Sequence, residues 1–319
     1  MMKSKSFHCS PTARALLAAG VIAAASFRAF AGDETADAKL SKSVIEPEEE
    51  PSRLHLLLQV EATSHYITPR GLDVADSGAS FQPLTVVMID AYRSKDNWLS
   101  LVQLWGSYWN DVGTVKYGAV PGYWNEIDFA GGVDIKFLKG FDLNISYSSF
   151  HSETSSYSTN GHFETTLAYH DSFMGPFSIN PNVWYFQELH KTATVQFNYS
   201  TTKEGFYFAP GIDPTYKFDP FPLTVELPTY VTLVSPSFYQ KLNGTPGGSG
   251  VGVFSTGYKF SVPLKFVPHS YGSWTIYTGF QYYYVQNQGA LDGNEFALTG
   301  KKYEQRDLYR FYGGVSIFF

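Results

Sequence analysis

The chain has 319 residues, of which 17% are aromatic and 16% charged, and its formal net charge at pH 7 is −6. This acidic balance argues against nucleic acid binding, which calls for a basic surface. The apolar run from Ala15 to Phe27 is shorter than the ~20 residues that a membrane-spanning helix needs, and no later run is as long, so the sequence predicts no such helix.

The first 31 residues have the layout of a secretory signal peptide. Basic residues precede the apolar run, and Ala29-Phe30-Ala31 supplies small residues for a cut before Gly32. We therefore predict a signal peptide over residues 1–31. Its removal changes the charge balance from 23 − 29 = −6 to 19 − 29 = −10 and takes away Cys9, the single cysteine, so we expect no thiol chemistry and no disulfide in the secreted form.

The next segment, residues 32–53, reads GDETADAKLSKSVIEPEEEPSR. It is acidic, poor in aromatic residues and interrupted twice by proline. Such a composition cannot bury enough apolar surface to fold. We expect a disordered, solvated lead in the periplasm.

Alternating polarity from Leu54 onward predicts twelve strands, each about as long as the ~9–11 residues that a tilted membrane strand requires. The predicted spans are 54–64, 79–92, 97–109, 123–137, 141–151, 161–171, 176–189, 205–217, 222–234, 253–266, 272–286 and 306–319. The gaps between them alternate, long at 65–78, 110–122, 152–160, 190–204, 235–252 and 287–305 and short elsewhere. Long loops on one rim and short turns on the other are typical of outer-membrane barrels, with the turns and both termini in the periplasm.

In several of these strands, apolar and polar residues lie on opposite faces. In the span 253–266, Phe254, Tyr258 and Phe260 alternate with Ser255 and Lys259, which indicates lipid outside and water inside. The predicted fold class is all-β: a transmembrane, up-and-down antiparallel β-barrel of about twelve strands over residues 54–319. The predicted lumen-lining residues are Glu61, Asp128, Asp134, Lys136, Asp142, Glu164, Glu188, Glu226, Lys259, Lys265 and Arg310.

The last strand carries a second, independent indication. Tyr309, Phe311, Val315, Ile317 and Phe319 share one face of an extended segment that stops on phenylalanine. This ending resembles the terminal strand of Gram-negative outer-membrane proteins, where it acts as an assembly signal. The resemblance implies outer-membrane lipid and the outer-membrane assembly machinery as partners. An ordinary last strand of a soluble sandwich is the alternative.

Three short elements are similar to those of the TorF-like outer-membrane protein family. They are Ser64-His65-Tyr66 with Arg70-Gly71, then Gly205-Phe206-Tyr207 with Pro214-Thr215-Tyr216, and Val262-Pro263-Leu264-Lys265-Phe266 with Tyr271-Gly272-Ser273-Trp274. The likeness extends over most of residues 54–319. It implies an outer-membrane location and a barrel fold, and brings no catalytic residues or substrate.

Histidine, serine and acidic residues occur near one another in the sequence, but not in a recognisable catalytic arrangement. His170-Asp171-Ser172 and His151-Ser152-Glu153 have no recognisable third member, and Glu188 beside His190 is no more than a pair at a strand end. The eight histidines lack metal-ligand spacing, and the glycine-rich run 244–250 precedes no helix and suits an external loop. We therefore expect no enzyme activity, no cofactor and no metal site.

The barrel interior is the remaining candidate for function. Twelve strands give a lumen wider than that of eight-stranded barrels and narrower than that of 16-stranded porins. Opposed charges across such a lumen predict a narrow, passive, porin-like channel for small hydrophilic solutes. A plugged structural or adhesive barrel is the first alternative, and an outer-membrane hydrolase is the second. The sequence leaves the solute and the oligomeric state open.

Overall fold

The computed structural model describes residues 52–118, 120–171, 174–189, 204–241, 243, 245–297 and 304–319. The predicted signal peptide and nearly all of the acidic segment 32–53 lie outside these ranges, so both stay predictions.

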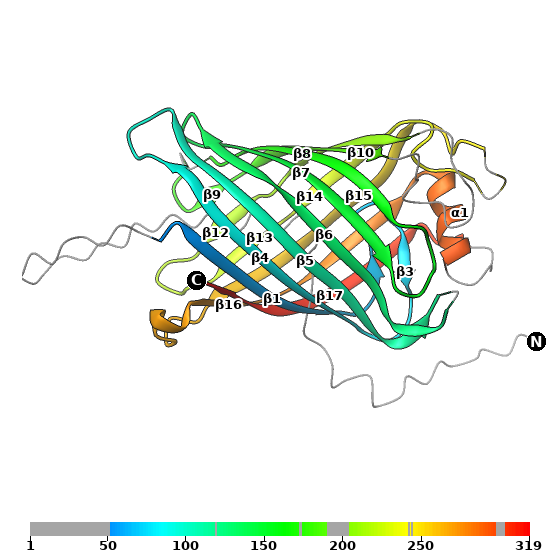
Figure 1. The fold of residues 1–319 in the computed structure, drawn as a ribbon, viewed down its shortest axis with the longest axis horizontal. Helices are drawn as coiled ribbons and strands as arrows, with labels where there is room; N and C mark the ends of the chain where they lie inside the picture. Colours follow the sequence, from blue (N-terminus) through cyan, green and yellow to red (C-terminus); the bar gives the residue numbers. More distant parts are fainter. Residues whose placement is uncertain are drawn as a thin grey trace, which may run out of the picture.

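Within the described ranges, twelve antiparallel strands form a closed, up-and-down barrel (Figure 1). Each strand pairs with its neighbours along the chain, and β1 pairs with β17 to complete the ring. This confirms the predicted fold class and strand number. The strands are β1 (Leu54–Thr63), β4 (Ser80–Arg93), β5 (Leu99–Tyr117), β6 (Gly122–Phe137), β7 (Phe141–Ser152), β8 (Asn160–Tyr169), β10 (Pro181–Leu189), β11 (Phe206–Ile212), β14 (Thr229–Val234), β15 (Gly250–Pro263), β16 (Ser273–Val285) and β17 (Asp307–Phe318).

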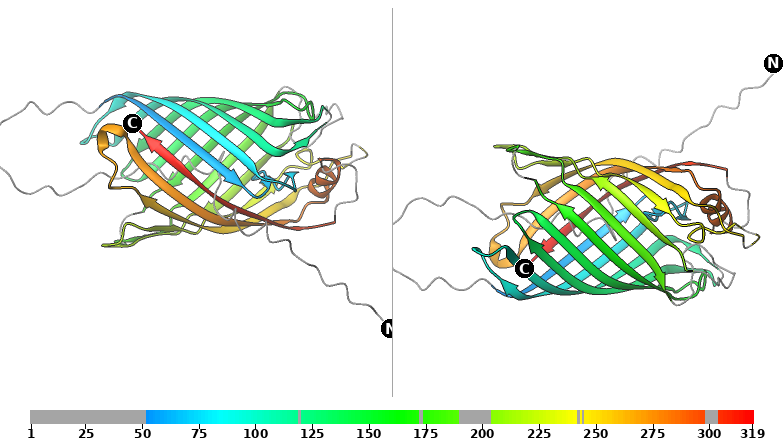
Figure 2. Two further views of the ribbon diagram at one scale, coloured as in Figure 1. Left: turned by 90° about the horizontal axis from the view of Figure 1, so that it is seen from below. Right: turned by 90° about the horizontal axis from the view of Figure 1, so that it is seen from above.

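The seam between β1 and β17 is continuous from Leu57↔Phe318 to Thr63↔Tyr312 (Figure 2). Leu56 and Phe319 extend it, since each donates its N–H to the other's carbonyl, at 3.2 and 2.9 Å. A closed ring leaves no sheet edge with unpaired backbone groups. The beginning of β1 and the last residue of the chain thus lie at one end of the barrel (Figure 2), which we call the terminal end; the opposite end is the loop end.

The hairpin between β5 and β6 differs from the prediction. The sequence predicts a long loop over 110–122, but β5 continues to Tyr117 and β6 begins at Gly122. The pairing register shifts between Asp111 and Val112 and again before Tyr117. Such β-bulges break the alternation of polarity while the strands stay paired, which is why the pattern suggested a loop.

Three of the predicted strands are divided at the terminal end, two of them at a proline. Asp213-Pro214 separates β11 from β12 (Thr215–Lys217), and Leu227-Pro228 separates β13 (Thr224–Glu226) from β14. Proline has no N–H for the ladder, so a continuous strand cannot pass through these positions. The span predicted as 176–189 likewise gives β9 (Phe177–Ser178) and then β10. β9, β12 and β13 pair in a short extension beside β15.

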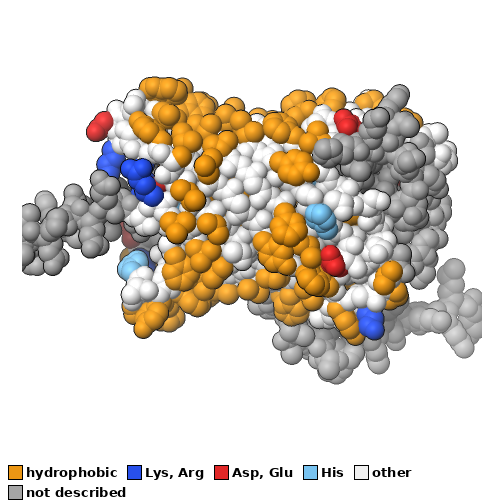
Figure 3. Space-filling model, in the orientation of Figure 1, with side chains coloured by type: hydrophobic (Ala, Val, Ile, Leu, Met, Phe, Trp, Pro, Cys, Tyr) orange, Lys and Arg blue, Asp and Glu red, His pale blue; other side chains and the backbone are white. Residues whose placement is uncertain are grey.

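The barrel is apolar outside and polar inside. Val60, Phe129 and Phe311 are 46–50% exposed on the exterior, whereas Glu61 and Arg310 are 0% and 4% exposed. Figure 3 shows hydrophobic side chains over much of the wall, with charged ones toward the two ends. This is the reverse of a soluble protein, which buries its apolar side chains. No helix in the described ranges is long and apolar enough to cross a membrane.

The connection between β1 and β4 turns into the barrel at the loop end. We call residues 64–79 the inserted segment. It forms a small hairpin of β2 (Tyr66–Ile67) and β3 (Asp73–Ala75), and helix α1 (Gln288–Ala297) contacts it (Figures 1 and 2). The sequence predicted only an external loop here.

A cross-link tests the closure of the ring. In a Cys9→Ser background, we expect Gln59→Cys with Ser316→Cys to form a disulfide, because these residues are direct cross-strand partners whose Cα separation suits a disulfide. Gln59→Cys with Phe318→Cys places the sulfurs on a diagonal about 7–8 Å apart and should not cross-link. The linked peptides are identified by mass spectrometry without reduction. Equal cross-linking of both pairs would contradict the register.

Candidate functional site

Hydrogen bonds fix the turn of the inserted segment inside the barrel. Thr68 accepts at its carbonyl from the N–H of Gly71, and Leu72 accepts from the N–H of Thr68, at 2.9 and 2.8 Å. Asn294 of α1 donates to the Gly71 carbonyl at 3.0 Å and accepts from the N–H of Asp73 at 2.8 Å. An irregular turn buried in a barrel needs such partners for its backbone groups.

Two tyrosines of the barrel and its loops complete this set of bonds. The hydroxyl of Tyr230, from β14, donates to the carbonyl of Pro69 at 3.0 Å, and the hydroxyl of Tyr239 donates to that of Arg70. On the other side, the hydroxyl of Tyr66 donates to Glu126 of β6 at 2.8 Å. The inserted segment is therefore bonded to opposite parts of the wall.

Apolar side chains fill the space around the inserted segment. Ile67 and Leu72, 1% and 2% exposed, belong to one buried cluster, and Tyr66 and Ala75 belong to a second. The wall and loop residues of these clusters are Phe186, Tyr207, Ala209, Val234, Phe238, Tyr239, Val253, Tyr283, Val285, Ala290, Leu291 and Leu308 in the first, and Leu57, Leu84, Val86, Met88 and Trp109 in the second. Together they pack the loop end, and the second cluster continues along β1 and β4 toward the terminal end.

Gly71 is placed where only glycine fits. Its φ is +78°, a conformation that side chains disfavour, and a Cβ at this position would lie 2.6 Å from Cγ2 of Val253. The turn can therefore approach β15 closely because residue 71 has no side chain.

Burial also acts on the titratable group at the start of the inserted segment. It lowers the pKa of His65, and nearby Asp76 partly offsets this by favouring the charged ring. A folded-state pKa below the unfolded value means that stability is complete above the unfolded pKa and decreases as the pH falls through it. Protonation of His65 therefore opposes the folded position of the start of the inserted segment.

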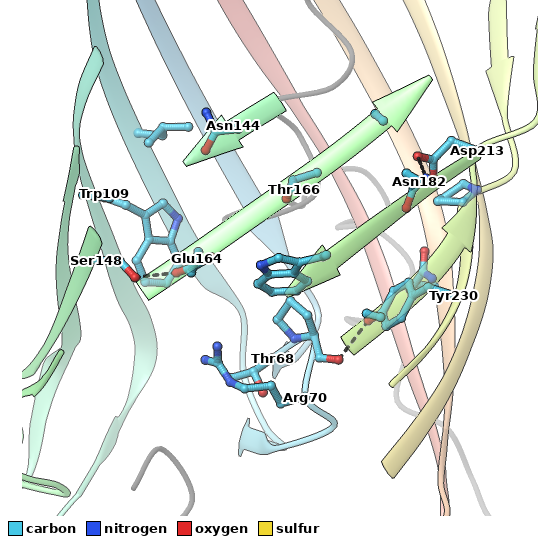
Figure 4. A pocket seen from close by; sticks show the side chains of 18 of the residues that line it. Thr68, Arg70, Trp109, Asn144, Ser148, Glu164, Thr166, Asn182, Asp213 and Tyr230 are labelled. Atoms are coloured by element: carbon cyan, nitrogen blue, oxygen red, sulfur yellow. Dashed lines mark hydrogen bonds between the residues drawn. The ribbon is translucent and has the colours of Figure 1, made fainter. Parts of the chain in front are cut away.

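A cavity of about 260 Å³ lies between the inserted segment and the terminal end (Figure 4). At ~30 Å³ for each water it has room for roughly nine waters, or for one small organic molecule. Its aromatic lining comes from Tyr66, Trp105, Trp109, Phe150, Trp184, Tyr230, Tyr283 and Tyr312. Its charged lining consists of Arg70, Asp128, Asp134, Asp142, Glu164, Asp213, Glu226, Lys259 and Arg310.

Two bases in the cavity wall are paired with acids. Lys259 Nζ lies 2.9 Å from Glu226 Oε2, and Arg310 Nη2 lies 2.8 Å from Glu61 Oε1. Arg310 also donates to Gln82 at 3.1 Å and to Thr63 at 2.9 Å. Pairing and hydrogen bonding of this kind lower the free-energy cost of burying a charge. These bases hold strands together around the lumen.

A looser charge cluster marks the terminal end of the cavity. Lys136 Nζ and His170 Nε2 lie 3.8 and 3.6 Å from Asp142 Oδ2, and their side chains are 28% and 32% exposed. Asp142 is the second residue of β7, and His170 directly follows β8. The polar lining therefore continues to solvent at this end, whereas the inserted segment closes the other.

The structure places the predicted lumen residues as follows. Asp128, Asp134, Asp142, Glu164, Glu226, Lys259 and Arg310 line the cavity, Lys136 borders it, and Glu61 lies behind Arg310. Glu188 is buried at the loop end, where it accepts from the N–H of Gly205 at 2.7 Å. Lys265 differs from the prediction: β15 ends at Pro263, so Lys265 is exposed in the turn that follows.

The residues weighed for catalysis lie apart. His170 faces Asp142 rather than a serine, and Ser172 and His190 are outside the described residues. His151 Nε2 lies 2.8 Å from Ser149 Oγ, and its ring packs against the outward Phe129. Asp171 accepts from two backbone N–H groups of the β9–β10 turn, at 2.9 Å each. In the part of the chain described, no three His, Cys, Asp or Glu residues are arranged to hold a metal ion.

Sequence reasoning missed Arg70 and the tryptophans of the cavity. A signal was present, since Tyr66, Ile67, Leu72 and Val74 put four large apolar residues into a segment predicted as an external loop. An apolar loop calls for a surface to bury it. Only the barrel interior offers such a surface within reach of residues 64–79.

No protein-family model and no curated protein matches the sequence, so the resemblance to the TorF-like family stays a prediction. Among solved structures, the chain is similar to the NanC porin, with 12% identity, a TM-score of 0.41 and coverage of 83% of this chain and 98% of that one. It is similar to an outer membrane channel from Pseudomonas putida F1, with 9% identity, a TM-score of 0.47 and coverage of 86% and 100%. It is also similar to the translocator domain of the autotransporter NalP from Neisseria meningitidis, with 12% identity, a TM-score of 0.41 and coverage of 85% and 90%. The barrel class of this chain rests on its own strand pairing.

Substitution of Gly71 tests the packing of the inserted segment. Gly71→Ala should lower the free energy of unfolding by about 2–5 kcal/mol, because left-handed strain adds to overpacking against Val253. Gly248→Ala is the matched control: its φ is +97° but no atom lies within 4 Å of the new Cβ, so about 1–2 kcal/mol of strain is expected. Urea unfolding followed by tryptophan fluorescence compares them. Equal losses would mean that residue 71 does not pack against β15.

Proposed function

We propose that the protein is a Gram-negative outer-membrane barrel with both termini in the periplasm, and that it is a narrow channel for small hydrophilic solutes, closed at its loop end in the described state. The observation that carries this proposal is the cavity, which is polar, reaches solvent at the terminal end and stops at the inserted segment. The apolar side chains on the outer face of the barrel support the membrane location. A closed barrel whose outward side chains are apolar satisfies its backbone within lipid.

The inserted segment is the part that must move for a solute to pass. It is a separate hairpin, held by side-chain bonds to Asn294, Tyr230 and Tyr239 and not by the barrel ladder itself. Segments held in this way open at a lower free energy than the strands around them. Displacement of residues 64–79 would join the cavity to the loop end.

A permanently plugged structural barrel is the second candidate, and the apolar packing at the loop end favours it. Ile67 and Leu72 are as buried as core residues of a soluble domain. We propose no catalytic role, since His170 of the cavity lining lies against Asp142 and not against a serine.

Arginine substitutions at two exposed positions test the membrane location. Phe129→Arg, midway along β6 on the outward face, should cost about 2–4 kcal/mol of folding free energy in lipid bilayers, because a charge then faces hydrocarbon. Leu138→Arg, in the turn at the terminal end, is equally exposed and should cost about 0–1 kcal/mol. Folding into phospholipid vesicles is followed by the shift in gel mobility without heating. Equal costs would argue against a lipid-facing wall.

Conductance in planar bilayers separates the channel from the plug. Asn294→Ala removes both bonds to the inserted segment and should raise the fraction of time in an open, discrete conductance level at least tenfold over the parent protein. Gln288→Ala, on the exposed face of the same helix, is the control and should leave that fraction unchanged.

Replacement of residues 66–75 by a glycine-serine linker should hold the barrel open. A silent bilayer with this variant, once its insertion is shown, would contradict the channel and leave the structural barrel.

A further inference from the structure

Arg70 holds a buried positive charge that no group of the described residues neutralises by direct contact. It is 6% exposed and lines the cavity. Its guanidinium carbon lies 5.1 Å from the ring centres of both Phe150 and Phe186. Among the described residues its guanidinium has no hydrogen bond or ion pair, and Nε is fully buried without a partner.

The other two bases of the cavity lining, Lys259 and Arg310, each bind a carboxylate directly. Among the described arginines and lysines of the lining, Arg70 is thus the exception, since it binds no carboxylate directly. The two phenylalanine rings stabilise its charge through their faces but accept none of its five N–H groups. An arginine left in this state calls for an acceptor that enters the cavity.

A second donor points to the same place. Trp109, from β5, is 3% exposed, and its Nε1–H is buried without an acceptor. Figure 4 shows Trp109 and Arg70 reaching the cavity from β5 and from the inserted segment, on either side of Ser148 and Glu164. Arg70 and Trp109 thus offer an arginine fork and an indole N–H to the same cavity, and a carboxylate can accept two parallel bonds from arginine and one more from another donor.

The acids of the lining restrict what else the ligand carries. The lining has three bases against six acids, so its formal balance is 3 − 6 = −3. A doubly charged phosphate would be repelled, whereas a single carboxylate is matched to Arg70. Asp128 Oδ1 is buried without a partner, and it can accept from a hydroxyl or an ammonium group.

We propose that Arg70 and Trp109 form the carboxylate-binding end of a site for a small organic acid that also bears hydroxyl or ammonium donors, with Asp128 accepting from those donors. This names the solute class of the channel, and it rests on the proposed function only in taking the cavity as the place where the solute binds. Opening of the inserted segment is not required for binding from the terminal end.

Tryptophan fluorescence of the full chain in detergent tests this site, because Trp105, Trp109 and Trp184 all line the cavity. Gluconate and serine are the probes, and sorbitol and ethanolamine are their counterparts without a carboxylate. We expect a saturable change with gluconate or serine and none with its counterpart. A response to gluconate alone identifies hydroxyl donors, and a response to serine alone identifies an ammonium donor.

Variants assign the response to Arg70. Arg70→Gln should weaken binding at least tenfold, and Arg70→Lys should weaken it less, because lysine keeps the charge without the fork. Arg53→Gln, an exposed arginine at the terminal end, is the control and should bind as the parent does. Unheated gel mobility verifies that each variant is folded.

Equal responses to a probe and its counterpart, unchanged binding by Arg70→Gln, or no saturable response to either acid would overturn the proposal. Bilayer conductance decides the channel separately. Binding with a silent bilayer would keep the site and reject the channel, and conductance without binding would do the reverse.

Discussion

The hydrogen-bonded seam between β1 and β17 is the constraint on which the rest of the structure depends. Once it closes, every strand has two partners and the chain acquires an inside and an outside with opposite demands. Alternate residues must then serve one or the other, so Val60 faces out and Glu61 faces in. The polar interior follows from closure, and with it the need to pair or use each buried charge.

Most of these buried charges pair with one another and stabilise the barrel, so few of them remain to bind a ligand. Glu61 with Arg310 and Glu226 with Lys259 each join two neighbouring strands of the wall. The inserted segment divides the interior into a loop end packed with apolar side chains and a cavity with polar and charged lining residues, which extends toward the terminal end. Arg70 lies at the boundary between the two, held by rings rather than by acids. The candidate site is therefore a product of the insertion as much as of the barrel.

Alternating polarity was enough to predict the strand number, the closure and which faces point inward, because these depend on local patterns with a period of two. Bulges at Asp111 and breaks at Pro214 and Pro228 shifted the strand boundaries, since both disturb the pattern without ending the sheet. The insertion was missed although the apolar residues of the segment indicated burial, because its place in the barrel depends on contacts between distant parts of the chain, such as Gly71 with Val253 and with Asn294. The same separation hid Arg70, which reads in sequence as an ordinary loop arginine.

Hydrogen exchange of the inserted segment, followed by mass spectrometry of the full chain in detergent, tests most directly whether a folded-in hairpin closes the loop end. Amides from Ile67 to Ala75 should exchange much more slowly than those of an external loop, though faster than those of β4, because Leu72, Asp73 and their neighbours are buried and bonded. The amides of Gly248 and Ser249, in the glycine-rich loop, give the rate of an external loop in the same sample. Exchange of residues 67–75 at that loop's rate would contradict the account and leave the barrel open at both ends.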